Sequence, residues 1–76
     1  MKELVEVIAK ALVDSPSEVV VKETEDDSTI NVELRVAPGD MGKVIGKQGR
    51  IAKSLRSVVK AAASRENARA DVEITD

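Results

Sequence analysis

The spacing of hydrophobic positions changes along the chain, and the first spacing is that of a helix. Six apolar residues near the start recur at intervals of three and four and predict a helix from about Lys2 to Asp14. They are Leu4, Val5, Ile8, Ala9, Leu12 and Val13. Pro16 cannot continue a helix, because it lacks the backbone N–H and its ring clashes with the preceding turn. The first helix is therefore expected to end just before it.

Two strand-like stretches follow the first helix. EVVVKETE, which begins at Glu18, is rich in β-branched residues, and TINVELRV, which begins at Thr29, alternates apolar and polar positions. The acidic stretch 25–27 with Ser28 separates them. Together the two stretches predict a hairpin with one face covered by the core. Carboxylates without further convergent ligands favour a solvated turn over a cation site here, and we assign no metal.

Helical spacing returns in the second half of the chain, where it is interrupted by glycines. After the turn residues of APGD, Asp40 is suited to begin a short helix that runs to Ile45 and stops at Gly46. A second helix is expected from about Gly49, with its apolar stripe on one side. The stripe comprises Ile51, Ala52, Leu55, Val58, Val59 and Ala62. After Asn67, the alternating RADVEIT predicts a last strand.

The predicted element order is α-β-β-α-α-β. Strands with one apolar face and helices with one apolar stripe are satisfied when all helices cover the same side of one sheet. We therefore expect an α+β fold with two layers, in which a three-stranded sheet carries its helices on one face. A chain of 76 residues is below the size at which chains divide, so residues 1–76 are expected to form a single domain.

Composition limits the chemistry that this chain can perform. There is no Cys and no His, so disulfides and the commonest metal ligand and general base are absent from the sequence. The remaining carboxylates, lysines and hydroxyls form no recognisable catalytic arrangement, and we expect neither enzyme activity nor a cofactor. The N-terminal residues lack the unbroken apolar run of a signal peptide, and no apolar run is long enough for a membrane. We expect a cytoplasmic protein.

Charge is distributed unevenly although the net charge is only −2. Residues 1–39 carry a net charge of −5, residues 40–60 carry +5 and residues 61–76 carry −2. The positive segment contains the sequence MGKVIGKQGR, which spans Met41 to Arg50. A glycine pair that lets another backbone approach closely, next to a helix start with free N–H groups and surrounded by cations, suits a phosphate ligand. The expected cations are Lys43, Lys47, Arg50 and Lys53, and Gln48 adds a neutral donor.

Two better-known phosphate loops do not fit this stretch. The Walker-type loop requires four residues between its first glycine and the following Gly-Lys-Ser/Thr, whereas Gly42 and Gly46 are separated by three, and Gln48 occupies the hydroxyl position. The dinucleotide fingerprint requires two glycines one residue apart after a strand, and this stretch has neither feature. The glycine spacing therefore indicates a different type of phosphate-binding loop.

VIGKQG, within the predicted element order, resembles the KH domain in the type II arrangement α-β-β-α-α-β, a module with a GXXG loop that clamps four nucleotides of RNA backbone. The longer stretch RVAPGDMGKVIGKQGRIAKSLR is similar to small stand-alone bacterial KH-domain RNA-binding proteins of the KhpA type, and the similarity covers essentially the whole chain. The chain departs from the broad KH pattern at Ala52, where many members carry a larger aliphatic residue.

The resemblance implies binding of single-stranded RNA without catalysis, as an RNA chaperone or post-transcriptional regulator. Its residues imply a clamp formed by Gly46, Lys47, Gln48 and Gly49, phosphate contacts from Arg50 and Lys53, and a base groove or helix anchor formed by Val44 and Ile45. It also implies pairing, either as a homodimer or with a larger KH-containing RNA-binding protein. The absence of aromatic residues agrees with this and argues against an RRM, whose sheet stacks bases on aromatic rings.

Several of these features have a simpler structural interpretation. The glycine loop is alternatively a tight connection between helices, and Val44 and Ile45 fit the core by periodicity. Arg56 and Lys60 are equally well explained as an ordinary solvated face. Gly42 serves either close helix packing or close approach of RNA. The three alanines at 61–63 form a surface for another subunit, or they are present only because alanine favours helix formation.

Overall fold

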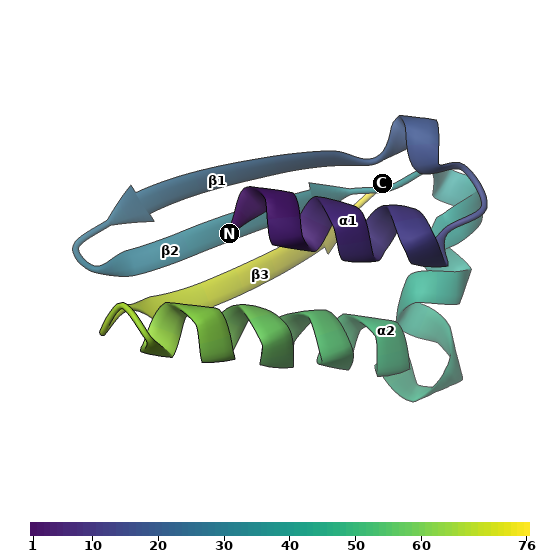
Figure 1. Cartoon of the computed structure of the whole chain (residues 1–76). Helices are drawn as coiled ribbons and strands as arrows, with labels where there is room; N and C mark the ends of the chain where they lie inside the picture. The colour runs from purple at the N-terminus through teal and green to yellow at the C-terminus, as the bar shows by residue number, and fades with distance from the viewer.

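The fold is a mixed three-stranded sheet covered on one side by helices (Figure 1). This computed structural model describes residues 1–46 and 49–76, and Lys47 and Gln48 lie outside the described residues. The elements are α1 (Lys2–Leu12), the 3₁₀ turn η1 (Pro16–Glu18), β1 (Val20–Asp26), β2 (Thr29–Arg35), α2 (Pro38–Ser64) and β3 (Arg69–Thr75). The predicted α+β class with helices on one face is confirmed. No helix within the described residues is long and apolar enough to cross a membrane.

The sheet has the order β1-β2-β3, with β2 in the centre. β1 and β2 form the predicted antiparallel hairpin, in which Asp26 pairs with Thr29 across the acidic turn. Asp27 and Ser28 have φ values of 50° and 66°, the positive angles that a tight hairpin turn requires. β3 runs parallel to β2, because α2 carries the chain back along the sheet before β3 begins. The acidic stretch 25–27 thus forms the end of β1 and the first residue of the hairpin turn.

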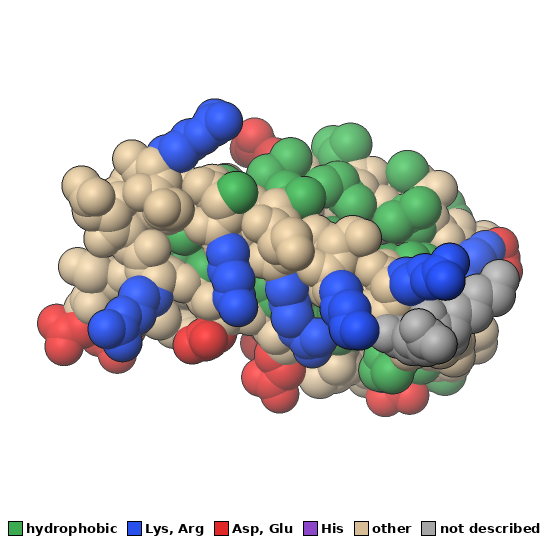
Figure 2. All heavy atoms as spheres, turned by 90° about the horizontal axis from the view of Figure 1, so that it is seen from below, with side chains coloured by type: hydrophobic (Ala, Val, Ile, Leu, Met, Phe, Trp, Pro, Cys, Tyr) green, Lys and Arg blue, Asp and Glu red, His purple; other side chains and the backbone are tan. Residues whose placement is uncertain are grey.

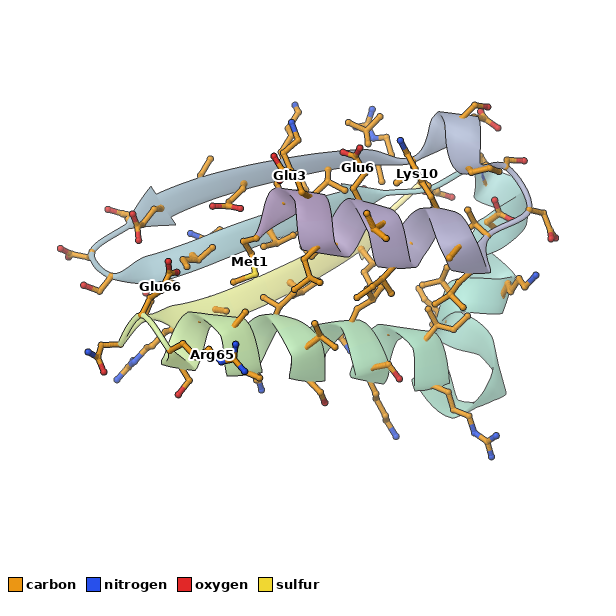
Figure 3. The ribbon with its side chains drawn as sticks, viewed as in Figure 1. Met1, Glu3, Glu6, Lys10, Arg65 and Glu66 are labelled. Atoms are coloured by element: carbon orange, nitrogen blue, oxygen red, sulfur yellow. The ribbon has the colours of Figure 1, made fainter. Side chains whose placement is uncertain are left out.

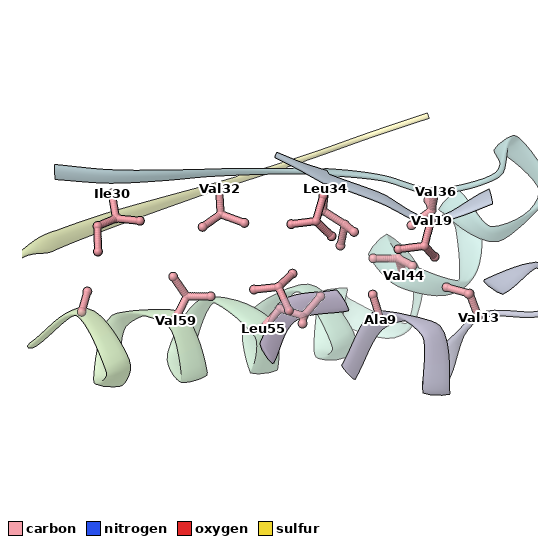
Figure 4. Packing of buried hydrophobic residues seen from close by; sticks show 13 residues of the cluster. Ala9, Val13, Val19, Ile30, Val32, Leu34, Val36, Val44, Leu55 and Val59 are labelled. Carbon is pink, nitrogen blue, oxygen red and sulfur yellow. The ribbon is translucent and has the colours of Figure 1, made fainter. Parts of the chain in front are cut away.

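The core lies between the sheet and the two helices (Figure 4). Alternate residues of β2, Ile30, Val32 and Leu34, point from the sheet toward α2, where Leu55 and Val59 meet them. Each fully buried aliphatic side chain contributes about 1.5–3 kcal/mol through removal of its surface from water. Aliphatic packing therefore holds this fold together without a single aromatic ring.

The structure differs from the sequence prediction in the middle of the chain, where two helices were expected. A single helical element, α2, covers both, and Figure 1 shows its ribbon turning sharply between two arms. We call residues 38–46 the first arm and residues 50–64 the second arm. Gly49 has a φ of +66°, a left-handed angle that a straight right-handed helix does not contain. The two predicted helices correspond to these arms, and the expected stop at Gly46 was wrong as a helix boundary.

The predicted role of Asp40 as the first cap of this helix was also wrong. The helix begins two residues earlier, at Pro38, whose fixed φ and missing N–H suit the first helical position. Asp40 is instead buried, with 2% of its surface exposed. Its Oδ1 accepts a hydrogen bond from the Asp14 N–H at 3.1 Å, and its Oδ2 accepts one from the Ser15 N–H at 3.1 Å.

These two hydrogen bonds join the first arm of α2 to the end of α1. They also explain why α1 ends at Leu12 and not at Asp14, because the N–H groups of Asp14 and Ser15 donate to a carboxylate and not to helix carbonyls. We call this pair of bonds the Asp40 latch. An exposed ion pair lies beside it, with Lys43 Nζ 3.1 Å from Asp14 Oδ1.

The Asp40 latch gives a stability prediction. Asp40→Asn retains the shape of the side chain but has only one acceptor oxygen, so one buried N–H loses its partner. Hydrogen bonds to charged groups contribute about 1.5–3 kcal/mol, and we expect a decrease of this size in the free energy of unfolding. Asp14→Asn is the matched control, because it removes only the exposed pair with Lys43 and should cost less than about 1 kcal/mol. Urea unfolding measures both, and equal losses would contradict the latch.

Candidate nucleic-acid interface

The bend of α2 depends on Gly49. At a φ of +66° a side chain would crowd the backbone, which costs an L-residue other than glycine roughly 1–2 kcal/mol. Apart from the chain neighbours and the adjacent helix backbone, no atom of the described residues lies within 4 Å of where a Cβ on Gly49 would stand, so the constraint is conformational and not one of space. The left-handed backbone conformation therefore explains why position 49 is a glycine.

Gly46 and Gly42 have no such internal explanation. Both lie in the first arm without a positive φ, and apart from their chain neighbours and the adjacent helix backbone no atom among the described residues comes within 4 Å of a Cβ placed on either. The open space excludes close helix packing as the reason for Gly42. Glycine in a helix costs roughly 1 kcal/mol relative to alanine. Gly42 and Gly46 are thus helix-weakening residues whose effect is to keep the surface of the first arm bare.

Val44 and Ile45, which the sequence analysis gave the same role as base groove or helix anchor, lie in different environments. Val44 is 1% exposed and belongs to the core cluster, whereas Ile45 is 51% exposed. Successive helix residues are 100° apart, so one can face the sheet while its neighbour faces solvent. Ile45 is one of only five large hydrophobic side chains exposed among the described residues. Val44 anchors the first arm, and Ile45 offers an aliphatic contact next to Gly46.

The predicted cations lie on both sides of the bend. Lys43 is on the first arm and engages Asp14, and Arg50 and Lys53 are exposed at the start of the second arm. An exposed ion pair such as that of Lys43 contributes little, so Lys43 can exchange its partner for another anion. The predicted clamp residues Lys47 and Gln48 lie outside the described residues. Figure 2 shows Lys and Arg side chains in a row along the second arm.

A family model described as KhpA/KhpB, KH domain, matches residues 2–74. The chain belongs to this KH-domain family. The resemblance drawn from VIGKQG and its surroundings is thereby confirmed.

Curated relatives match over nearly their whole length. A protein from Clostridium acetobutylicum is 64% identical over 74 residues, covering 97% of this chain and 99% of the relative. One from Halalkalibacterium halodurans is 58% identical over 76 residues, covering all of both chains, and one from Aquifex aeolicus is 46% identical, covering all of this chain and 96% of the relative. All three are named RNA-binding protein KhpA.

A solved structure shares the fold of this KH domain. It is that of Era in complex with MgGDPNP and nucleotides 1506-1542 of 16S ribosomal RNA, with a TM-score of 0.63 and 22% sequence identity. The match covers 97% of this chain and 28% of the Era chain. The KH fold described here therefore also occurs as one part of a larger protein.

Sequence reasoning missed two features of this KH domain. The role of Asp40 depends on partners 25 and 26 residues away, and no local pattern signals such a contact. Arg69 was not singled out, yet it lines a hollow together with Lys60. The predicted change from helix to strand near Asn67 is the signal that could have revealed it, because this change places Lys60 and Arg69 at the same end of the sheet. Ala52 is buried, so its small size affects packing in the core.

The two glycines of the GXXG sequence should respond oppositely to substitution by alanine. Gly46→Ala should stabilise the fold by up to about 1 kcal/mol, because it removes a helix-weakening residue without a clash. Gly49→Ala should destabilise it by about 1–2 kcal/mol, because of its left-handed backbone. Thermal and urea unfolding of the pair measure both effects. Destabilisation by Gly46→Ala would show that the fold itself requires that glycine.

Proposed function

We propose that this KH domain binds single-stranded RNA without catalysis and that the bend of α2, from Gly46 to Arg50, is where it holds the RNA backbone. The observation that carries the proposal is Gly46, which the fold does not need and which leaves the surface beside the bend bare. A bare backbone surface inside the +5 segment suits the close approach of a phosphate chain.

The backbone at the bend supports phosphate binding. A left-handed residue next to right-handed ones leaves successive N–H groups pointing into one concavity, an arrangement that binds anions. Gly49 supplies the left-handed residue, and the second arm that follows it adds the positive end of a helix dipole. Lys43, Arg50 and Lys53 surround this point with positive charge, and we place Lys47 and Gln48 in the same contact.

Aliphatic residues are the available partners for bases. Ile45 is exposed beside the bend, and Ile51 is half-buried just after it. Without aromatic stacking, base contacts rest on this apolar surface and on hydrogen bonds, and affinity rests largely on phosphates. Binding should therefore be modest, weakly selective and strongly dependent on salt. These properties suit an RNA chaperone or post-transcriptional regulator in the cytoplasm, and the names of the relatives agree with RNA as the ligand.

The decisive variant is Lys47→Asp with Gln48→Asp. It places negative charge against phosphate, and the loss of about 1.5–3 kcal/mol for each charged hydrogen bond removed predicts RNA binding weakened by tenfold or more. Fluorescence anisotropy with a labelled oligoribonucleotide measures the affinity, and circular dichroism with thermal unfolding shows whether the fold is retained.

The control is Lys2→Asp with Ser17→Asp, which changes the net charge equally at exposed positions of α1 and η1. Acidic residues are well tolerated at a helix start such as that of α1. The control should retain nearly all affinity. Equal affinity of the two double variants, with both folded, would refute contact at the bend.

A second function, as a subunit that pairs with itself or with a larger KH-containing RNA-binding protein, is favoured by an apolar surface between α1 and the second arm. Leu4, Val58, Ala61, Ala62 and Arg65 line a hollow of about 260 Å³ there, and Leu4 is 40% exposed. Figure 3 shows the charged Glu3, Glu6 and Lys10 on the side of α1 turned away from this hollow. Figure 2 shows hydrophobic side chains gathered on the same face of the molecule as the basic row.

Self-pairing would give each particle two RNA sites and raise its apparent affinity through avidity. Light scattering over a dilution series, with and without RNA, should show twice the monomer mass at high concentration. Ala61→Glu should remain monomeric throughout, because a charge would be buried in the interface. Ser17→Glu, at an exposed site in η1, should behave as the unmodified chain does. A monomer at every concentration would eliminate self-pairing and leave only the larger partner.

A further inference from the structure

The positive surface of this protein continues well past the bend. Arg50, Lys53, Arg56 and Lys60 are all exposed on the second arm, and their spacing places them away from the stripe of the buried Leu55 and Val59. Figure 2 shows Lys and Arg side chains following one another along this arm. None of the four takes part in an ion pair within the described residues. The row is therefore available to a ligand.

The row leads to a hollow at the far end of the second arm. This distal hollow, of about 420 Å³, is lined by Thr29, Lys60, Ala68, Arg69, Ala70 and Asp71. It lies where the end of α2 meets the start of β3, and the Arg69 N–H donates to the Ser28 carbonyl at 2.9 Å, which fixes the backbone there. Lys60 belongs both to the basic row and to the hollow. Arg69 adds a second cation from a different element.

We propose that the basic row and the distal hollow bind RNA beyond the four nucleotides held at the bend, with Lys60 and Arg69 as phosphate contacts at the far end. This inference rests on the proposed function of the bend. From Gly49 to Lys60 the second arm rises about 16 Å. That length corresponds to about five nucleotides of a stacked strand at roughly 3.4 Å per phosphate, and to fewer if the strand is extended. The whole site then accepts about eight or nine nucleotides.

The chemistry of this surface favours RNA over a protein partner. The exposed large hydrophobic side chains among the described residues are Leu4, Val7, Leu12, Val20 and Ile45, and none of them lies on the second arm. Protein interfaces generally require an apolar centre, whereas a phosphate backbone requires a line of cations. Asp71 in the hollow accepts hydrogen bonds, and an RNA strand supplies donors in its 2′-hydroxyls and base amino groups.

The same structure limits how far the RNA extends. The hydrogen bond from Arg69 to Ser28 brings the start of β3 next to the hairpin turn, and the acidic stretch 25–27 precedes that turn. Its three carboxylates repel phosphate immediately beyond the hollow. The track therefore has two defined ends, the bend of α2 and the hairpin turn.

The length of RNA at which affinity stops rising tests this inference. Dissociation constants for oligouridylates of four, six, eight, ten and twelve nucleotides are measured by nuclear magnetic resonance titration for the weak ligands and by anisotropy for the tight ones. For the unmodified protein we expect affinity to rise steeply up to about eight or nine nucleotides. Beyond that it should grow only with the number of binding registers. A plateau at four would overturn the inference.

Lys60→Gln with Arg69→Gln identifies the residues responsible. Binding of the tetranucleotide should change less than twofold, whereas binding of the decanucleotide should weaken about tenfold. Its salt slope should fall by about 1.4, because each of the two phosphates that is no longer neutralised accounts for about 0.7. The control Lys2→Gln with Lys22→Gln removes the same charge from α1 and β1. It should leave the binding of the tetranucleotide and of the decanucleotide unchanged. Equal losses on all lengths, or a decanucleotide loss matched by the control, would overturn the inference. The inference would also be overturned if oligoglutamate displaced the decanucleotide as effectively as unlabelled RNA does.

This test is separable from that of the bend. If Lys47→Asp with Gln48→Asp leaves tetranucleotide binding intact while Lys60→Gln with Arg69→Gln weakens the decanucleotide, the bend proposal fails and the distal contact remains. If the first variant abolishes tetranucleotide binding and the second shows no dependence on length, the bend proposal remains and the distal contact fails.

Discussion

One left-handed residue determines the form of this protein. Gly49, at a φ of +66°, lies at the sharp bend between the two arms of α2, so that one arm lies near the end of α1 and the other lies along the sheet. The parallel return of β3, the placement of Leu55 and Val59 against β2, and the exposed corner with its cations all follow from that change of direction. A residue with a Cβ would oppose it at a cost comparable to a tenth or more of a typical domain's stability.

Two different interactions hold the first arm in place before the bend. Val44 ties it to the core through apolar burial, and the Asp40 latch ties it to the α1 terminus through two hydrogen bonds to a buried carboxylate. Rigid support of this kind allows the arm to carry glycines whose only structural effect is to weaken it. Figure 2 shows Lys and Arg side chains following one another along the second arm, although the first half of the chain is acidic. An overall negative protein thereby presents a positive track to a polyanion.

The sequence predicted most of the fold because its periodicities are clear. The alternation of β2 and the stripe of the second arm correspond to half-buried elements, and the glycines marked the bend to within a residue or two. Other features depended on contacts between distant positions. Asp40 is a good cap by its local sequence, but Pro38 starts the helix earlier and the carboxylate is used by residues 25 and 26 positions away. Val44 is buried and Ile45 is exposed because of the orientation of the first arm, which the sequence does not specify. Lys60 and Arg69 line the same hollow only because β3 packs next to the second arm.

The central claim is that the bend of α2 is the surface that grips the RNA backbone. The most direct measurement is a nuclear magnetic resonance titration of ¹⁵N-labelled protein with a short oligouridylate, in which every backbone amide is followed. The account predicts that the largest shifts occur at the amides from Gly46 to Arg50, with smaller ones along the second arm. Shifts concentrated on the open face of the sheet or on α1, with the amides of the bend unmoved at saturation, would contradict it.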